Sequence, residues 1–491
     1  MTDKAASGVP GLDSIMAGGF TRGCFFLLEG NPGTGKTTLA LRFLLEGQSA
    51  DERNLYITLS ETKGELLNGA ASHGWTLDSN TEVFELQPAE NLLDPNQQQS
   101  LLYTSELELG EAIKLIFDAV NRIKPARIVI DSLSEIRLLA QSSLRYRRQL
   151  LALKHYFARC DATVLALDDL TTDAQDKSAH SIAHGVISLE ELTPTYGAER
   201  RRMRVMKYRG QAFRGGYHDF IIKTGGIEVF PRLVSKEHVN ILPAAVFSSG
   251  NIKLDALLGG GIDSGSSTLL LGPAGAGKSL LGFQFAAAAI RRGEKAALFA
   301  FDEELGLLFR RTKGMGIDLE SFRNEGSLIV EQIDAAELSP GEFAHRVGRC
   351  VQENGVRTVI IDSLNGYQMA MPEEQSLILH MHELLQYLNR LGTATFVTVA
   401  QHGLVGDMKT PVDVTYLADT VILLRFFEAE GRVRRAISVI KKRTGAHEDT
   451  IREMQITSSG LVLGDPLADF HGVLGGVPTY VGGPNPSPQE A

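Results

Sequence analysis

The chain has 491 residues, of which 43% are hydrophobic and 22% are charged, and this mixture excludes a wholly disordered protein. Acidic residues outnumber basic ones by 59 to 49, and the net charge of −10 disfavours a constitutive binder of duplex DNA. The three cysteines are widely spaced, which argues against a disulfide framework or a zinc site and indicates a reducing cytoplasm. The sequence lacks a run of about 18 apolar residues, so we expect neither a membrane span nor a secretory signal.

A long internal repeat organises the chain. SGVPGLDSIMAGGFTRG begins at Ser7 and SGNIKLDALLGGGIDSG begins at Ser249, an offset of 242 residues. RIVIDSLSE at 127–135 and TVIIDSLNG at 358–366 match with an offset of 231. A period this long indicates a duplicated domain rather than a solenoid repeat. We predict domains at 1–230 and 249–481, a linker at 231–248 and a disordered tail at 482–491.

Short apolar runs alternate with amphipathic segments in each copy. This alternation predicts an α/β fold in which a mainly parallel sheet is flanked by helices. Each copy ends with further strand-like segments, at 202–210 and 220–230 and then at 435–443 and 452–463. In the first copy we expect a helix at 37–47 and strands at 24–30, 54–59, 127–131 and 162–168. In the second copy we expect a helix at 279–293 and strands at 267–272, 296–301, 358–362 and 394–400.

Each copy also carries a glycine-rich loop between its first long strand and the following helix. GNPGTGKT at 30–37 and GPAGAGKS at 272–279 both fit G-x-x-x-x-G-K-[ST]. Glycines let backbone N–H groups turn toward phosphates, the lysine reaches the outer phosphates, and the final hydroxyl binds Mg²⁺. The alternative is a glycine-rich turn without nucleotide. The predicted ATP-binding residues are Gly33, Thr34, Gly35, Lys36, Thr37 and Thr38, and Gly275, Ala276, Gly277, Lys278, Ser279 and Leu280.

Acidic residues follow two further strands of each copy. Asp131 and Asp362 end apolar strands, where a carboxylate faces the phosphate crevice and, with the hydroxyls of Thr37 and Ser279, can bind Mg²⁺. The alternative for both aspartates is a helix N-cap. Surface acids are common after strands, but the repeated position predicts catalytic roles in orienting water or accepting a proton, with Asp302 also a metal-ligand candidate. These candidates are Glu61 in the first copy and Asp302 and Glu303 in the second.

Together these motifs resemble the KaiC family of circadian-clock ATPases and autokinases. The resemblance runs from about 7 to 480 and includes GLDSIMAGG, SHGW at 72–75, KYRG at 207–210 and RRAISVIKKR at 434–443. It implies two tandem RecA-like P-loop NTPase domains in a double-ring homohexamer, with ATP between neighbouring subunits. It further implies that the first domain hydrolyses ATP, that the second is capable of autophosphorylation, and that a KaiB-like regulator is a partner.

The resemblance assigns further residues one at a time. Lys207 and Arg209 match the K-x-R that reaches the neighbour's γ-phosphate, and Lys441 and Arg443 match it in the second copy. The alternative for the segment around Lys207 is a solvated basic face or a nucleic-acid strip. Two further nucleotide contacts are implied, Ser72 in the first ring and Arg435 in the second.

The chain departs from the family pattern at two places. The family has paired glutamates in both rings, whereas the first position of the pair is Ser60 in the first copy and Asp302 in the second. In the autokinase loop, Thr415 falls on the serine acceptor, Thr410 falls on a third hydroxyl, and Tyr416 replaces the threonine acceptor. Phosphorylation at a single site, Thr415, is the resulting expectation, and the alternative is that Thr415 is only a β-favouring residue before a strand.

Two other classes of function compete with a KaiC-like ATPase. The first is a DNA-dependent ATPase of the RecA or helicase type, which predicts basic loops after the aspartate-ending strand. SSLRYRRQLLALKH at 142–155 is basic, but MAMPEEQSLILHMHE at 369–383 is not, so nucleic acid is not an expected partner. The second is a nucleotide-gated scaffold with negligible turnover.

Overall fold

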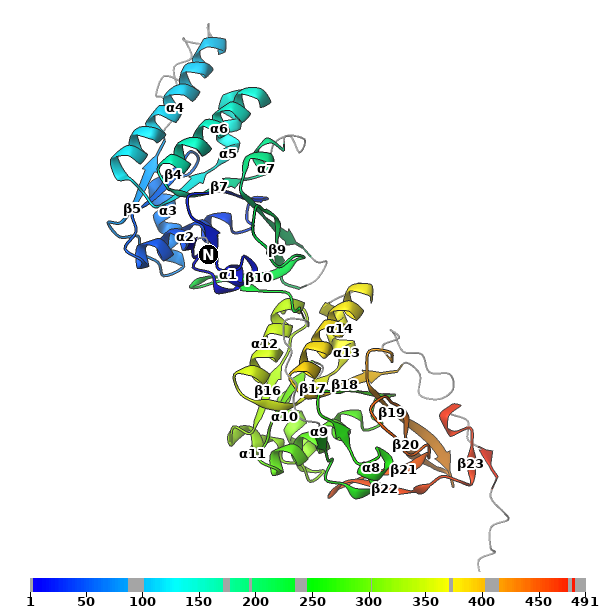
Figure 1. Cartoon of the computed structure of the whole chain (residues 1–491). Coiled ribbons are helices and arrows are strands. Elements are labelled where there is room, and N and C mark those ends of the chain that lie inside the picture. The colour runs from blue at the N-terminus through cyan, green and yellow to red at the C-terminus, as the bar shows by residue number, and fades with distance from the viewer. Residues whose placement is uncertain are drawn as a thin grey trace, which may run out of the picture. The chain divides into compact units, whose positions relative to one another are not determined.

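The computed structural model describes residues 3–86, 101–170, 177–193, 197–234, 245–301, 303–370, 374–401, 415–475 and 479–481. The chain divides into two compact units, Met1–Arg232 and Leu233–Ala491 (Figure 1). Each unit contains a nine-stranded sheet with helices against it, so the predicted tandem α/β architecture is confirmed. None of the helices in the described ranges is both long and apolar enough to cross a membrane.

The sheet of the first unit has the order β11-β10-β9-β8-β3-β7-β6-β4-β5. Strands β8 to β5 in this order are parallel, and β9, β10 and β11 extend the sheet in antiparallel fashion. The strands are β3 (Phe25–Gly30), β4 (Asn54–Thr58), β5 (Thr81–Glu85), β6 (Arg127–Asp131), β7 (Thr163–Asp168), β8 (Gly185–Leu192), β9 (Arg200–Tyr208), β10 (His218–Lys223) and β11 (Gly226–Phe230).

The second unit repeats this topology with the order β16-β15-β17-β18-β14-β19-β20-β21-β22. Its first six strands are parallel and its last three are antiparallel. They are β14 (Ser267–Gly272), β15 (Lys295–Ala300), β16 (Leu328–Gln332), β17 (Val356–Asp362), β18 (Ala394–Ala400), β19 (Thr420–Ala429), β20 (Arg432–Lys442), β21 (Arg452–Thr457) and β22 (Gly460–Pro466). Short pairs join β1 (Lys4–Ala5) to β2 (Phe20–Thr21), β12 (Val246–Phe247) to β13 (Ile262–Asp263), and β23 (Phe470–His471) to β24 (Thr479–Tyr480).

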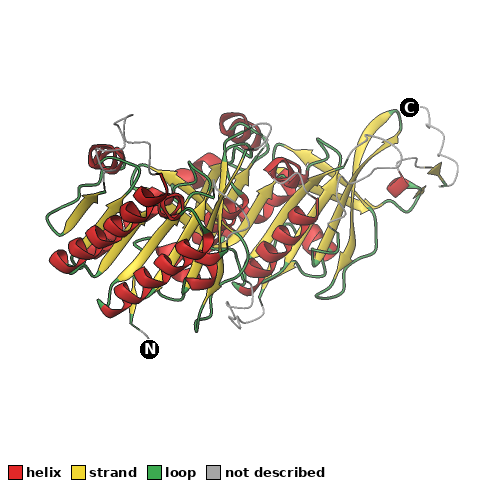
Figure 2. Ribbon diagram, turned by 90° about the horizontal axis from the view of Figure 1, so that it is seen from above, coloured by secondary structure: helices red, strands yellow, loops and turns green. Residues whose placement is uncertain are grey.

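Helices cover both faces of each sheet, as the red helices along the yellow strands show (Figure 2). The central strands β3, β4, β6 and β7 are buried along their whole length, which explains their continuous apolar sequences. The first unit has α1 (Pro10–Ile15), α2 (Lys36–Ser49), α3 (Lys63–Ser72), α4 (Leu101–Ile123), α5 (Leu133–Ala140), α6 (Ser143–Arg159) and α7 (Ser178–Ile182). The second has α8 (Ile252–Leu257), α9 (Lys278–Arg291), α10 (Leu305–Lys313), α11 (Leu319–Asn324), α12 (Pro340–Gln352), α13 (Leu364–Ala370), α14 (Glu374–Arg390) and the 3₁₀ turn η4 (Val473–Gly475).

In each unit, a large apolar cluster forms on each face of the sheet. In the first unit, Phe43 and Leu44 of α2 pack with Phe26 of β3 on one face, whereas Leu150 of α6 packs with Leu27 on the other. Alternate side chains of one strand therefore contribute to opposite clusters, as the two-residue period of a strand requires. This two-faced burial fixes the carboxyl ends of the parallel strands, where the phosphate loop and the strand-terminal acids lie.

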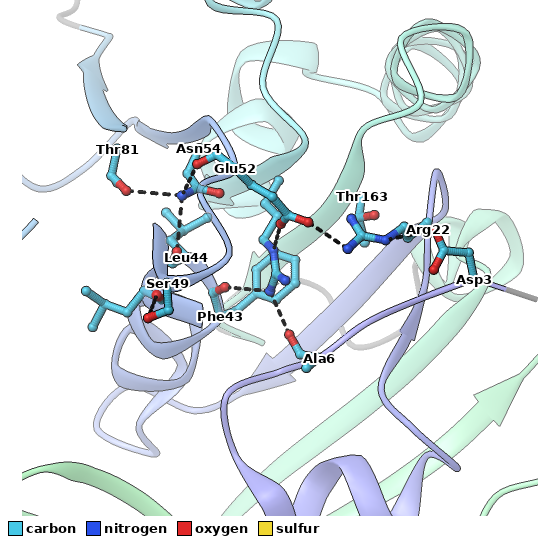
Figure 3. A network of polar contacts seen from close by, with 12 residues as sticks. Asp3, Ala6, Arg22, Phe43, Leu44, Ser49, Glu52, Asn54, Thr81 and Thr163 are labelled. Carbon is cyan, nitrogen blue, oxygen red and sulfur yellow. Dashed lines mark hydrogen bonds and ion pairs between the residues drawn. The ribbon is translucent and has the colours of Figure 1, made fainter. Parts of the chain in front are cut away.

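A polar network crosses the apolar interior of the first unit near the start of β6 (Figure 3). The Arg127 side chain is only 2% exposed. Its Nε donates to Glu52 at 2.5 Å, and its Nη1 donates to the carbonyls of Ala6 at 2.6 Å and Phe43 at 2.9 Å. This guanidinium therefore joins the N-terminal segment, the interior of α2 and the loop after α2 to the amino end of β6, because a buried charge needs such partners.

Candidate nucleotide-binding sites

Both predicted phosphate loops lie between a buried strand and the helix that follows it. The first joins β3 to α2, which begins at Lys36, and the second joins β14 to α9, which begins at Lys278. Gly35 and Gly277 precede these helices with φ of 94° and 105°, a left-handed conformation that glycine adopts without strain. The loop therefore delivers backbone N–H groups and a helix N-terminus to one edge of each sheet, an arrangement suited to anions.

The two loop lysines are folded back onto the ends of their strands. Lys36 Nζ donates to the carbonyl of Gly30 at 2.8 Å, and Lys278 Nζ donates to the carbonyl of Gly272 at 2.9 Å. A second carbonyl lies within 3.0 Å of Lys36 and 2.8 Å of Lys278. Burial lowers the pKa of Lys278, and the charge of Asp362 opposes this shift. Each ammonium is thus placed at the edge where phosphates would bind.

The strand-terminal aspartates lie at the same edges. Asp131 ends β6 and accepts a hydrogen bond from Tyr56 at 2.5 Å, whereas Asp362 ends β17 and accepts one from Thr398 at 2.5 Å. The alternative of a helix N-cap is wrong for Asp131, because Ser132 occupies the N-cap position of α5. Both aspartates interact with residues of the phosphate loops, Asp131 with the charge of Lys36 and Asp362 with Lys278 and the hydroxyl of Ser279.

Burial raises the pKa of Asp131 to about 6. The hydrogen bond from Tyr56 and the charge of Lys36 lower it, while Glu61 and Asp169 raise it further. Burial also raises the pKa of Asp362, and hydrogen bonds from Thr398 and Ser279 oppose that shift. A carboxylate whose ionisation is costly without a nearby positive charge is suited to receive a cation at this position.

The candidate catalytic acids have different surroundings in the two copies. Glu61 follows β4, and burial raises its pKa, with smaller contributions from the charges of Glu65 and Asp169. Glu303 follows β15 and forms a two-pronged ion pair with Arg311, at 3.0 and 2.6 Å. Asp302 lies outside the described residues. The first site therefore holds a glutamate whose pKa is raised by burial, whereas the second holds one paired with a guanidinium.

Lys207 and Arg209 lie along β9 and the turn after it, and both contact backbone carbonyls of their own subunit. Lys207 Nζ donates to the carbonyls of His180 at 2.6 Å and Ala183 at 2.8 Å, and Arg209 donates to Ser181 at 2.5 Å. Burial lowers the pKa of Lys207, with a further contribution from Arg209. Both side chains are thereby anchored beside β8.

The second copy repeats this anchorage. Lys441 Nζ donates to the carbonyls of Thr415 at 3.0 Å and Ala418 at 2.8 Å, and Arg443 donates to that of Tyr416 at 2.9 Å. Burial and the adjacent Arg443 lower the pKa of Lys441. The candidate acceptor Thr415 therefore lies in a turn directly bound by the lysine of the K-x-R pair.

The remaining predicted residues occupy varied positions. Ser72 is the last residue of α3 and donates to the carbonyl of Gly69 at 2.7 Å. Arg435 lies on β20, where its Nε is 3.4 Å from the carbonyl of Gly275 in the second phosphate loop. Thr410 lies outside the described residues.

Four side chains that the sequence patterns did not single out complete these sites. They come from strands or helices other than those that carry the motifs, and each contacts a predicted residue. The one available signal was the charged pair Asp168-Asp169 at the end of the predicted strand at 162–168, and it applies to Asp169. The four are Tyr56 on Asp131, Asp169 on Lys36, Arg311 on Glu303 and Thr398 on Asp362.

Comparisons with known proteins agree with this geometry. The family model "ATPase: KaiC" matches residues 5–234 and 248–467. The chain is 27% identical over 486 residues to "Circadian clock protein KaiC3" of Synechocystis sp., with 97% of this chain and 95% of that protein covered. It is 29% identical over 491 residues to "Circadian clock oscillator protein KaiC" of Prochlorococcus marinus, with 97% and 95% covered. With both repeats matched across their sheets and phosphate loops, the chain belongs to the KaiC ATPase family.

Proposed function

We propose that the protein binds Mg-ATP in both domains and hydrolyses it at the subunit interfaces of a double-ring homohexamer. The observation that carries this proposal is the repeated site: in both domains, a buried lysine at a helix N-terminus lies close enough to the carboxylate ending a parallel strand, one strand removed in the sheet, for their charges to interact. This combination of anion site and cation ligand is suited to a nucleoside triphosphate with its metal.

The residues present fit a magnesium ion in each site. Hard cations prefer oxygen ligands, and the hydroxyls of Thr37 and Ser279 begin the same helices as the loop lysines, opposite Asp131 and Asp362. Bound Mg²⁺ neutralises charge on the phosphates. Lys36 and Lys278 would then exchange their carbonyl partners for phosphate oxygens.

Glu61 and Glu303 are proposed to orient the attacking water. The raised pKa of Glu61 keeps more of it protonated than an exposed glutamate. At Glu303, Arg311 occupies both carboxylate oxygens, so the carboxylate must rotate or share this partner to accept a proton. We therefore expect unequal turnover in the two domains.

The proposed interfaces require groups that reach a neighbouring nucleotide. We assign this role to Lys207 and Arg209 in the first ring and to Lys441 and Arg443 in the second, because a cation supplied across an interface neutralises transition-state charge. Ser72 and Arg435 are proposed as additional nucleotide contacts. The family resemblance extends the proposal to a KaiB-like regulator as partner and to a cytoplasmic location.

The described contacts disfavour the DNA-dependent alternative at the basic strand β9. Arg201 pairs with Glu191 at 2.9 Å, and Arg202 pairs with Glu190 at 2.8 Å. Arg202 also lies 3.9 Å from the centre of the Tyr217 ring. These cations already have partners within the sheet, so this strand offers little free positive charge to a nucleic-acid backbone.

Native mass measurement with and without Mg-ATP tests the assembly proposal. We expect ATP to shift the chain from lower forms to a hexamer, because a ligand bound only by the assembled form favours that form. Lys36→Ala should abolish most of the first-ring assembly or hydrolysis, and Lys278→Ala should act mainly on the second. Lys295→Ala, at the exposed amino end of β15, is the matched control. A monomer that saturates with ATP without changing mass would contradict the proposal, and stimulation of turnover by single-stranded DNA would favour the alternative.

A slow autokinase activity of the second domain is the finer part of this proposal. The Thr415 hydroxyl must approach a neighbour's γ-phosphate to about 3–3.5 Å, with Asp302 or Glu303 accepting its proton. Mass spectrometry after incubation with Mg-ATP should find phosphate on Thr415 and none on Tyr416, whose ring is too bulky to replace a threonine. Loss of this phosphate in Glu303→Gln and Asp302→Asn would support the assignment. An unmodified Thr415 and Thr410 would leave a pure ATPase, and negligible turnover as well would leave a scaffold.

A further inference from the structure

The loop lysine of the first domain has an anionic partner. Besides its two carbonyls, Lys36 Nζ lies 2.9 Å from Asp169 Oδ1. The lysine side chain is 6% exposed, whereas that of Asp169 is 31% exposed. This ion pair therefore stands at the boundary between the buried loop and solvent, where the outer phosphates of a nucleotide would meet the ammonium.

Strand register identifies the residue that takes this position in the second domain. The pairing of β3 with β7 places Glu29 opposite Asp168, and the pairing of β14 with β18 places Leu271 opposite Val399. Glu29 and Leu271 are equivalent in the repeat, since each directly precedes its phosphate loop. The residue after Asp168 is therefore equivalent to Ala400, which carries no charge.

The residue that contacts this position from beyond the end of the adjacent strand also differs between the two domains. In the first domain, Ser134 Oγ donates to Asp169 Oδ2 at 3.2 Å, which leaves Oδ1 directed at Lys36. In the second domain, Asn365 takes the equivalent place and bonds the backbone of Ala400, accepting from its N–H at 2.7 Å and donating to its C=O at 3.3 Å. The carboxylate and its hydroxyl donor are thus replaced together by a neutral side-chain-to-backbone contact.

The difference in charge has a direct consequence for phosphate binding. A buried ammonium is costly to leave unpaired, so Asp169 stabilises the loop without nucleotide. A polyphosphate brings further negative charge to the same ammonium, and Asp169 then becomes a like charge beside it. We propose that Asp169 competes with the outer phosphates of ATP for Lys36 and so weakens nucleotide binding at the first site relative to the second. This inference rests on the proposed function, because it assumes that both loops bind ATP.

Titration of Mg-AMP-PNP into the full-length chain tests the proposal. Lys278→Ala removes the second site, so that the first is measured alone. In this background, the Asp169→Asn chain should bind Mg-AMP-PNP about 10-fold more tightly, which is the scale expected for removing a single, partly exposed contact between like charges. The affinity for AMP should not change, because AMP lacks the phosphates that reach the loop lysine. A merely structural role of Asp169 would alter both ligands alike.

The reverse substitution provides an independent arm. In a chain carrying Lys36→Ala, which leaves the second site alone, Ala400→Asp should weaken Mg-AMP-PNP binding by a similar factor. If Asp169→Asn reduces the folded fraction, as reported by the fluorescence of Trp75, the Ala400→Asp arm decides. Unchanged or weaker binding by a folded Asp169→Asn chain overturns the inference while leaving the proposed function intact. Failure of the parent chain to bind at either site overturns the proposed function itself.

Discussion

Replacing Arg127 by methionine should destabilise the first unit selectively. Methionine retains much of the apolar stem but donates no hydrogen bond, so the carbonyls of Ala6 and Phe43 lose their bonds from the guanidinium and Glu52 loses one of its two guanidinium partners. The guanidinium also lies 4.8 Å from the Phe43 ring centre, a contact that is lost as well. The perturbation therefore removes several interactions at one buried point (Figure 3).

The magnitude follows from these contacts. A hydrogen bond to a charged group contributes about 1.5–3 kcal/mol, and each buried acceptor left without a donor costs about 1–3 kcal/mol. Glu52 remains paired with Arg22 at 2.6 Å, which limits the cost of its isolation. Burial acts to raise the pKa of Glu52, but the hydrogen bonds and charges of Arg127 and Arg22 outweigh it and lower the pKa. We expect a loss of about 3–5 kcal/mol, as is typical when one partner of a buried pair is removed.

The assay uses the single tryptophan of the chain, Trp75, which reports on the first unit alone. Urea unfolding followed by its fluorescence gives the change in the free energy of unfolding. Arg22→Met is the matched control, since Arg22 is 29% exposed and its pairing contributes about 0–1 kcal/mol. The second unit has Thr358 at the equivalent position, so its transition, which Trp75 does not report and which circular dichroism can follow, should not move. A loss below about 1 kcal/mol for Arg127→Met, or one equal to that of the control, would refute this reasoning.

Three smaller changes probe other contacts. Gly226→Ala should cost about 2–4 kcal/mol in Trp75-monitored unfolding, because the added Cβ would lie 2.4 Å from the indole and the φ angle of 113° is unfavourable for alanine. Gly225→Ala, whose added Cβ would have no atom within 4 Å, should cost about 1 kcal/mol. Burial lowers the pKa of His218 from 6.5 to about 4, so its neutral form stabilises the fold above pH 6.5 and this stability is lost as pH falls toward 4. His218→Gln should remove about 3 kcal/mol of that pH dependence in acid titrations of unfolding. Tyr56→Phe removes the donor to Asp131 and should weaken Mg²⁺-dependent ATP binding at the first site by about 2- to 10-fold at pH 7, as measured by Mg²⁺ titration.

The sequence was most informative for the parts of the site that are built from residues close together along the chain. The phosphate loops and the aspartates ending β6 and β17 were predictable because a loop, a helix start and a strand end are local features, and each occurs twice. Tyr56 and Asp169 were not assigned, since each reaches its partner from a different strand of the sheet and its contact depends on strand order. Arg311 is eight residues from Glu303, yet helix spacing alone does not show that its side chain turns back to the preceding strand.

The two domains preserve the scaffold of the site while exchanging its polar partners. The shortest contacts of each K-x-R lysine are to a pair of carbonyls three residues apart, those of His180 and Ala183 in the first domain and those of Thr415 and Ala418 in the second. The same anchorage therefore places His180 where the second domain has its candidate acceptor. His180 Nε2 lies 2.6 Å from a carboxylate oxygen of the residue that precedes the first phosphate loop, so this position offers an engaged imidazole rather than a hydroxyl. This position therefore carries a hydroxyl side chain in the second domain and an imidazole in the first, and this difference is the reason that the autokinase proposal is made for the second domain alone.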